Sequence, residues 1–137
     1  MTAKVFLDTN VLLYACSSAP ADETKQAVAE QLILEADFAI SAQVMQEFIA
    51  NALRKKSLGI SESQIEATME LLGYVPVLPI TRELVLSAIE FRRRFQLSHW
   101  DACILAAAGK LGCAIVYSED LNHNQDYDGI RVLNPFQ

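Results

Sequence analysis

The sequence predicts an α/β fold in which helices flank a central parallel sheet of four to five strands. Short β-like apolar runs alternate along the chain with longer stretches of helical periodicity. This alternation favours right-handed βαβ crossovers and a sheet covered on both faces. Hydrophobic residues make up 52% of the 137 residues and charged residues 20%. We therefore expect residues 1–137 to form a single domain with a substantial core.

The first half of the chain contains two expected strands and four expected helices. Strands are expected at 5–7 and 38–40, and helices at 10–16, at 22–35, after Ser41 as far as Gly59, and after Ser61 as far as Gly73. Apolar residues at 44, 45, 48, 49, 52 and 53 give the third helix one apolar face. Ser41 is a candidate N-cap, and the run 61–64 is typical of a capping box.

The second half continues the same alternation. The expected elements are a strand at 75–80, helices from Thr81 to about Phe95 and from Ser98 to about Leu111, and strands at 114–117 and 130–133. Ligands of parallel α/β sheets bind beyond the carboxyl ends of the strands. Asp8 directly follows the first strand, and the segment 118–120 directly follows the strand at 114–117. This edge of the sheet is therefore the expected position of a functional site.

Composition and charge exclude several classes of protein. The formal net charge is −6, which argues against broad, non-specific DNA binding. The three cysteines include no CxxC pair, so free thiols in a reducing cytosol are expected rather than a disulfide framework or a zinc knuckle. Asp8 and Asn10 interrupt the apolar start of the chain, and no run approaches the roughly 18 apolar residues of a membrane span. We expect a cytoplasmic protein with no signal peptide and no membrane association.

Four acidic side chains lie where separate elements could meet in one cleft. They are Asp8 at a strand end, Glu47 about two turns into a helix, Asp101 in the first turn of a helix, and Asp120 just past the fourth strand. Each has an ordinary structural interpretation, since Asp8 and Asp101 can cap helices, Glu47 can be a solvated helix residue and Asp120 a turn residue. Only their joint placement favours a shared site.

Such a cluster of carboxylates requires cations. Two carboxylates about 4 Å apart repel by about 4 kcal/mol at an effective dielectric constant of about 20, so protonation or metal binding must relieve the charge. Oxygen ligands without a His or Cys partner favour Mg²⁺ or Mn²⁺ over Zn²⁺. These cations activate water and stabilise the leaving alkoxide when a phosphodiester is hydrolysed. A phosphodiester is therefore the expected substrate.

Three short motifs resemble those of PIN-domain nucleases. They are Leu7-Asp8-Thr9-Asn10-Val11-Leu12, Ser98-His99-Trp100-Asp101-Ala102 and Ser118-Glu119-Asp120-Leu121. Asn134-Pro135-Phe136 is also similar to the end of many bacterial members. The resemblance spans essentially the whole chain, and more narrowly the chain looks like the VapC-type toxins of bacterial toxin–antitoxin pairs.

This resemblance implies a PIN-like fold, a Mg²⁺-dependent endoribonuclease activity on RNA, a homodimer and an antitoxin protein that blocks the site. Mn²⁺ could replace Mg²⁺, and either one or two metal ions could bind. The implied metal ligands and catalytic residues are Asp8, Glu47, Asp101 and Asp120, and the implied supporting residues are Asn10, Ser118 and Glu119. Two adjacent acids leave open whether Asp120 or Glu119 is the fourth ligand. Ser118 replaces the commoner Thr of the motif and keeps its hydroxyl.

Of the alternative functions considered for this sequence, two stay open and two are excluded. A PIN-fold RNA-processing nuclease outside a toxin–antitoxin system and a catalytically inactive RNA- or protein-binding module both stay open. A haloacid-dehalogenase-type phosphatase would need Asp where Asn10 stands, and a calcium loop starting at Asp120 lacks the required Gly and Glu. The basic runs 54–56 and 92–94 are candidate phosphate contacts, although a solvated surface explains most of these side chains equally well.

Overall fold

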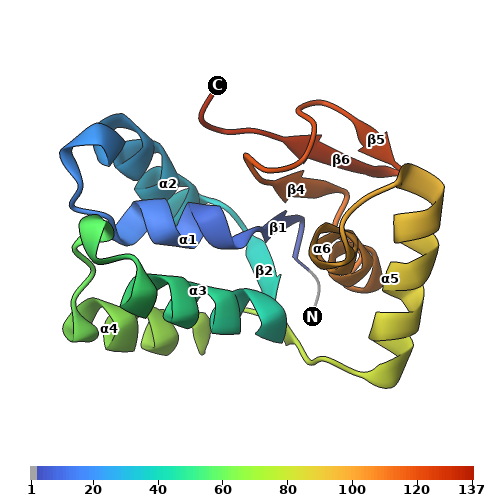
Figure 1. Cartoon of the computed structure of the whole chain (residues 1–137), viewed down its shortest axis with the longest axis horizontal. Coiled ribbons are helices and arrows are strands. Elements are labelled where there is room, and N and C mark those ends of the chain that lie inside the picture. The colour runs from blue at the N-terminus through green and yellow to red at the C-terminus, as the bar shows by residue number, and fades with distance from the viewer. Residues whose placement is uncertain (1–2) are drawn as a thin grey trace.

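The computed structural model describes residues 3–137 and contains one six-stranded sheet (Figure 1). The strands are β1 (Val5–Leu7), β2 (Phe38–Ser41), β3 (Val77–Leu78), β4 (Ile115–Tyr117), β5 (Asp126–Tyr127) and β6 (Ile130–Leu133). Their order is β3-β2-β1-β4-β6-β5, and every neighbouring pair is parallel except β5 with β6. The predicted α/β fold class is confirmed, with β1 and β4 at the centre of the sheet.

Helices lie on both sides of the central strands. The α-helices are α1 (Thr9–Cys16), α2 (Glu23–Glu35), α3 (Ala42–Arg54), α4 (Glu62–Leu72), α5 (Arg82–Phe95) and α6 (His99–Lys110), with short 3₁₀ helices at Pro20–Asp22 and Lys56–Leu58. Figure 1 shows α1 to α4 on one side of β1 and β2, and α5 and α6 on the other. In the described range 3–137, every helix is too short or too polar to span a lipid bilayer.

Side chains from both faces of the sheet form one hydrophobic core. Phe6, Leu7 and Ile40 on the central strands are fully buried. The segment Ala102–Ala108 of α6 is also buried. Its small alanine side chains allow α6 to pack closely on α5 and on the sheet. This packing brings the first turn of α6 near the carboxyl ends of β1 and β4.

Helices α3 to α6 start where the sequence predicts, and each of these starts has a side-chain cap. The hydroxyls of Ser41, Ser61, Thr81 and Ser98 each accept a hydrogen bond from a backbone N–H in the first turn of the helix that follows. Ser61 and Gln64 complete a capping box. These bonds satisfy donors that a helix leaves unpaired at its start. Helix α3, which carries Glu47, therefore begins directly at the end of β2.

Three details of the prediction differ from the structure. The five parallel strands agree with the predicted parallel sheet of four to five strands, but the sixth strand was missed, because a two-residue β5 forms an antiparallel hairpin with β6. The turn residues Asp128 and Gly129 have φ of 57° and 90°, as an Asp-Gly hairpin turn requires. Helix α3 ends at Arg54 rather than at Gly59, which ends the following 3₁₀ helix with φ 63°. The strand expected at 75–80 shortens to Val77–Leu78.

The cap of α3 makes a measurable contribution to stability. The Val44 N–H donates to the buried Ser41 hydroxyl at 3.3 Å. Ser41→Ala leaves this N–H unpaired, so the free energy of unfolding should fall by about 1–2 kcal/mol. Urea denaturation measures the change. Ser57→Ala, an exposed serine that caps no α-helix, should stay within about 0.5 kcal/mol of wild type. Equal stability of the two variants would contradict the assigned cap.

Candidate active site

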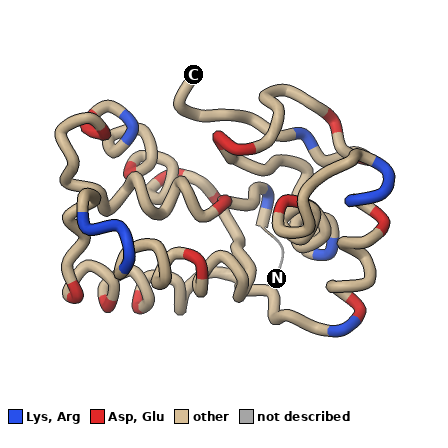
Figure 2. Tube along the Cα trace, viewed as in Figure 1, with Lys and Arg blue, Asp and Glu red and all other residues tan. Residues whose placement is uncertain are grey.

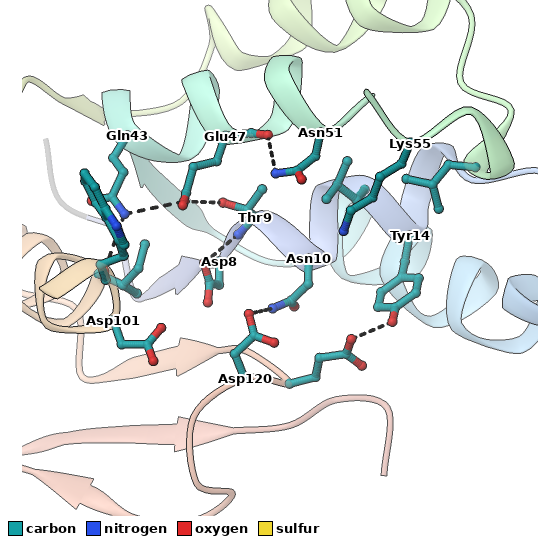
Figure 3. A pocket seen from close by; sticks show the side chains of 15 residues that line it. Asp8, Thr9, Asn10, Tyr14, Gln43, Glu47, Asn51, Lys55, Asp101 and Asp120 are labelled. Atoms are coloured by element: carbon teal, nitrogen blue, oxygen red, sulfur yellow. Dashed lines mark hydrogen bonds between the residues drawn. The ribbon is translucent and has the colours of Figure 1, made fainter. Parts of the chain in front are cut away.

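A pocket of about 240 Å³ opens at the carboxyl ends of β1 and β4. It lies between α1, α3 and α6 (Figure 3). The predicted acids Asp8, Glu47, Asp101, Glu119 and Asp120 all line it, together with Asn10. Figure 3 shows Asp8, Asp101 and Asp120 directed into the same space from three different elements. Side chains that lie far apart in the sequence therefore share one cavity.

Asp8 is the most deeply placed of these acids. It follows β1 and is only 4% exposed. Its Oδ1 accepts a hydrogen bond from the Thr9 N–H at 2.7 Å, and its Oδ2 accepts one from the Ser118 hydroxyl at 2.7 Å. The first bond makes Asp8 the N-cap of α1. Asp8 therefore caps a helix and lines the pocket, so the two interpretations of this residue do not exclude each other.

Ser118 connects three parts of the site through one fully buried hydroxyl. This hydroxyl donates to Asp8 and accepts from the Asp120 N–H at 3.1 Å and from Asn10 Nδ2 at 3.4 Å. Asn10 Nδ2 also donates to Asp120 Oδ2 at 3.2 Å. Asn10 and Ser118 thus hold Asp8 and Asp120 in a fixed relative orientation.

Glu47 and Asp101 enter the pocket from helices. Glu47 accepts a hydrogen bond from the Thr9 hydroxyl at 2.9 Å and a longer one from Gln43 Nε2 at 3.4 Å. Asp101 lies in the first turn of α6, where its backbone N–H donates to the Ser98 hydroxyl at 3.2 Å. The carboxylate of Asp101 is directed into the pocket (Figure 3). Both side chains are half-buried rather than solvated on a helix surface.

The environment of the pocket raises the pKa of Asp8 and Asp101 and so disfavours their ionised forms. Burial raises the pKa of Asp8 from 3.8 to about 7, although the hydrogen bonds from Ser118 and Thr9 act in the opposite direction. The negative charges of Asp120 and Glu47 raise this pKa further. Burial also raises the pKa of Asp101, and the charge of Asp120 adds to that shift. A cation in the pocket would reverse these effects.

Glu119 and Asp120 occupy different environments, although they are adjacent. Glu119 forms an ion pair with Lys25 at 3.0 Å and accepts a hydrogen bond from the Tyr14 hydroxyl. Asp120 is exposed to the pocket, and its single side-chain hydrogen bond in the described structure comes from Asn10. A carboxylate already neutralised by a lysine is the poorer ligand for a second cation. The geometry therefore favours Asp120 as the fourth acid of the pocket.

The residues of the pocket are compatible with a hydrated divalent cation. Within residues 3–137, no three His, Cys, Asp or Glu side chains are close enough together to hold one metal ion directly. The available donors are carboxylate and amide oxygens, which suit a cation that keeps several of its own waters. The buried Oδ1 of Asn10 lacks a hydrogen-bond donor among the described residues. Water on such a cation could supply one.

The two basic runs differ in their relation to the pocket. Lys55 lines it, and its amino group is directed into it (Figure 3). Arg94 instead pairs with Asp128 at 3.0 Å, and no residue of 92–94 lines the pocket. Figure 2 places the basic end of α5 on the opposite side of the molecule from α3. The prediction that either run contacts phosphate therefore keeps geometric support only at Lys55.

Several residues of the pocket were not predicted from the sequence. They are Thr9, Leu13, Tyr14, Gln43, Asn51, Leu58, Trp100 and Ile104. Gln43, Glu47 and Asn51 recur at intervals of four, so they share one face of α3, and Lys55 continues this spacing as the C-cap residue of the helix. This spacing was the available signal for two of the missed residues.

The chain matches one protein-family model and is similar to several solved structures. The family model of the PIN domain matches residues 5–126. A toxin–antitoxin complex from Klebsiella pneumoniae is similar at TM-score 0.68 and 21% identity, covering 96% of this chain and 97% of that one. The Mycobacterium tuberculosis toxin VapC20, which cleaves the sarcin–ricin loop, is similar at TM-score 0.67 and 21% identity, covering 85% and 89%. DNA-bound VapBC from Salmonella typhimurium is similar at TM-score 0.67 and 20% identity, covering 95% of this chain and 96% of that one. No curated protein sequence matches the chain significantly.

The raised pKa of Asp8 makes metal-free stability depend on pH. Between about pH 4 and pH 7 the folded protein holds a proton at Asp8 that the unfolded chain has released. The associated stability is present below about pH 4 and is lost as the pH rises towards 7. Relative to Asp8→Asn, the free energy of unfolding in chelator should fall by up to about 4 kcal/mol over this range.

Urea denaturation of both proteins between pH 4 and pH 8 measures this difference. Acids that titrate alike in the wild type and in the variant cancel when the two profiles are subtracted. Above pH 7 the difference should level off. Adding Mg²⁺ at pH 8 should stabilise the wild type more than the variant. Parallel pH profiles for the two proteins would refute the assigned burial of the Asp8 charge.

Proposed function

Because the chain belongs to the PIN domain family, we propose that it is a Mg²⁺-dependent endoribonuclease that hydrolyses phosphodiester bonds of RNA. The main support is the convergence of Asp8, Glu47, Asp101 and Asp120 on one pocket from four separate parts of the chain. Mn²⁺ is chemically close enough to replace Mg²⁺ at oxygen ligands.

Asp8, Asp101 and Asp120 are proposed to hold one or two cations, directly or through water, and Glu47 completes the cluster. A bound divalent cation would polarise the phosphoryl oxygens and lower the pKa of the attacking water. Asn10 and Ser118 orient the carboxylates of Asp8 and Asp120 through the hydrogen bonds described above. Water is the proposed nucleophile rather than the ribose 2′-hydroxyl, so the products carry a 5′-phosphate and a 3′-hydroxyl.

The proposed biological role is that of the toxin in a type II toxin–antitoxin pair. The similar solved structures include a toxin–antitoxin complex and VapBC, and their fold extends over nearly the whole of this chain. On this proposal the protein is cytoplasmic and forms a homodimer, and an antitoxin protein binds it and blocks the pocket. A neighbouring small gene whose product co-purifies with this chain and inhibits it would support this role.

Cleavage of RNA should require the cation and Asp101. Purified protein should cut total cellular RNA with Mg²⁺, lose this activity in EDTA and regain it on addition of Mg²⁺ or Mn²⁺. Asp101→Asn should keep the fold and lower the rate by about 100-fold or more, because a group that holds the cation is lost. Asp37→Asn, an exposed acid before β2 and outside the pocket, is the matched control.

Gel analysis of the RNA and mapping of its ends measure these outcomes. Cleavage that ignores EDTA, or products with 2′,3′-cyclic phosphate ends, would contradict the proposed chemistry. No cleavage of any RNA in the presence of Mg²⁺ would favour a non-catalytic binding module.

Two neighbouring substitutions test the choice of the fourth acid. Asp120→Asn should weaken Mg²⁺ binding and lower the cleavage rate about 10- to 100-fold. Glu119→Gln removes a charge that Lys25 already neutralises, so its effect on Mg²⁺ affinity should be several-fold smaller. Isothermal titration with Mg²⁺ measures both affinities. The reverse order of effects would assign the ligand role to Glu119.

A further inference from the structure

One face of α3, together with the C-cap residue Lys55 that follows it, forms a polar track along the pocket. Gln43, Glu47, Asn51 and Lys55 recur every four residues and all line the cavity. Figure 3 shows these four side chains in sequence along α3, with Gln43 at one end and Lys55 at the other. At a rise of about 1.5 Å per residue along the helix, the Cα atoms of Gln43 and Lys55 lie about 18 Å apart along its axis. The track therefore extends well beyond the space that a hydrated cation needs.

Trp100 lies at the Gln43 end of this track. Gln43 Nε2 donates to the backbone carbonyl of Trp100 at 3.4 Å, and Trp100 is one of the residues that line the pocket. Trp100 is 62% exposed, whereas the core buries most other large apolar residues. Its ring contacts His99 edge to face, with 5.1 Å between the ring centroids. An exposed, laterally supported indole at the rim of a polar pocket is suited to stacking against a planar ligand.

Lys55 lies at the opposite end. It is exposed, and the salt bridges found within residues 3–137 do not include it. Among the residues that line the pocket, it is the single lysine or arginine. The nearby Arg54 donates to Asn51, and Lys25 is paired with Glu119. Lys55 is therefore the cation best placed to bind an anionic group of a ligand in this pocket.

The geometry points to Trp100 and Lys55 as the residues that bind the substrate at the two ends of the track. An unpaired RNA base stacks on Trp100, and Lys55 binds a backbone phosphate. This inference rests on the proposed ribonuclease function and deepens it. The carboxylates between the two ends repel RNA in the absence of cations, so affinity must come from elsewhere. Stacking on an aromatic ring requires a free base face, which single strands and loops offer and duplexes do not.

Trp100 is the single tryptophan of the chain, so its fluorescence reports directly on this end of the pocket. Asp8→Asn serves as a background that binds RNA without cutting it. In Mg²⁺, a short single-stranded RNA should quench the fluorescence in a saturable manner. A blunt duplex of the same sequence should quench it much less.

Substitutions in this background separate the two contacts. Trp100→Ala should weaken binding of a labelled single-stranded RNA about 5- to 150-fold, and Trp100→Phe should retain part of the affinity. Lys55→Ala should lower the slope of log Kd against log salt concentration by about 0.7, the value for one phosphate contact on a single strand. Lys56→Ala, an adjacent exposed lysine outside the pocket, is the matched control and should leave the slope unchanged.

The outcomes distinguish this inference from the proposed function. If the wild type cuts RNA but Trp100→Ala and Lys55→Ala bind and cut normally, the proposed contacts of Trp100 and Lys55 are wrong and the proposed nuclease function is retained. If no RNA is cut but single strands still quench Trp100, the nuclease is wrong and the binding track stands. If RNA leaves the fluorescence unchanged and Trp100→Ala instead alters the oligomeric state in sedimentation, Trp100 belongs to a protein interface and the inference is overturned.

Discussion

The burial of the Asp8 charge links the fold of this protein to its pocket. The carboxylate sits where β1, β4 and α1 meet, and burial alone would favour its neutral form. Hydrogen bonds from Thr9 and Ser118 offset part of this cost. The Thr9 donor comes from the next residue along the chain, whereas the Ser118 hydroxyl reaches Asp8 because β1 pairs with β4 in the sheet. The same arrangement that creates the electrostatic strain therefore brings together the oxygens on which a cation can relieve it.

Much of the fold follows from local sequence patterns. Strands β1 and β6 and the start residues of α3 to α6 were predicted because apolar periodicity and cap chemistry act over a few residues. The failures involve contacts between distant segments. Gly59 does not end α3 but lies against Ser18, where an added Cβ would approach the Ser18 hydroxyl to 2.2 Å. Strand β5 has only two residues, too few for an alternating pattern, although the Asp-Gly turn after it was a readable hairpin signal.

The candidate site shows a similar division. The positions of Asp8 and Asp101 follow from their motifs and from the rule for strand ends, and the structure brings both into one pocket. The distinction between Glu119 and Asp120 did not follow, because it depends on Lys25, a residue 94 positions away from Glu119. Lys55 and Trp100 were seen only as part of a basic run and of a motif. Their relation to α3 depends on side-chain directions that spacing alone leaves open.

The Ser118 hydroxyl restricts what evolution can place at this position. A hydroxyl carries one hydrogen and two acceptor lone pairs, and at Ser118 the hydrogen goes to Asp8 while the lone pairs face Asn10 and the Asp120 N–H. Alanine would leave these three partners unmatched, and asparagine or aspartate would add atoms to a fully enclosed space. Threonine keeps this bonding pattern and adds one methyl group, fewer atoms than asparagine or aspartate would add. Variation among homologous sequences at this position should therefore be confined to serine and threonine wherever the acid before α1 is retained.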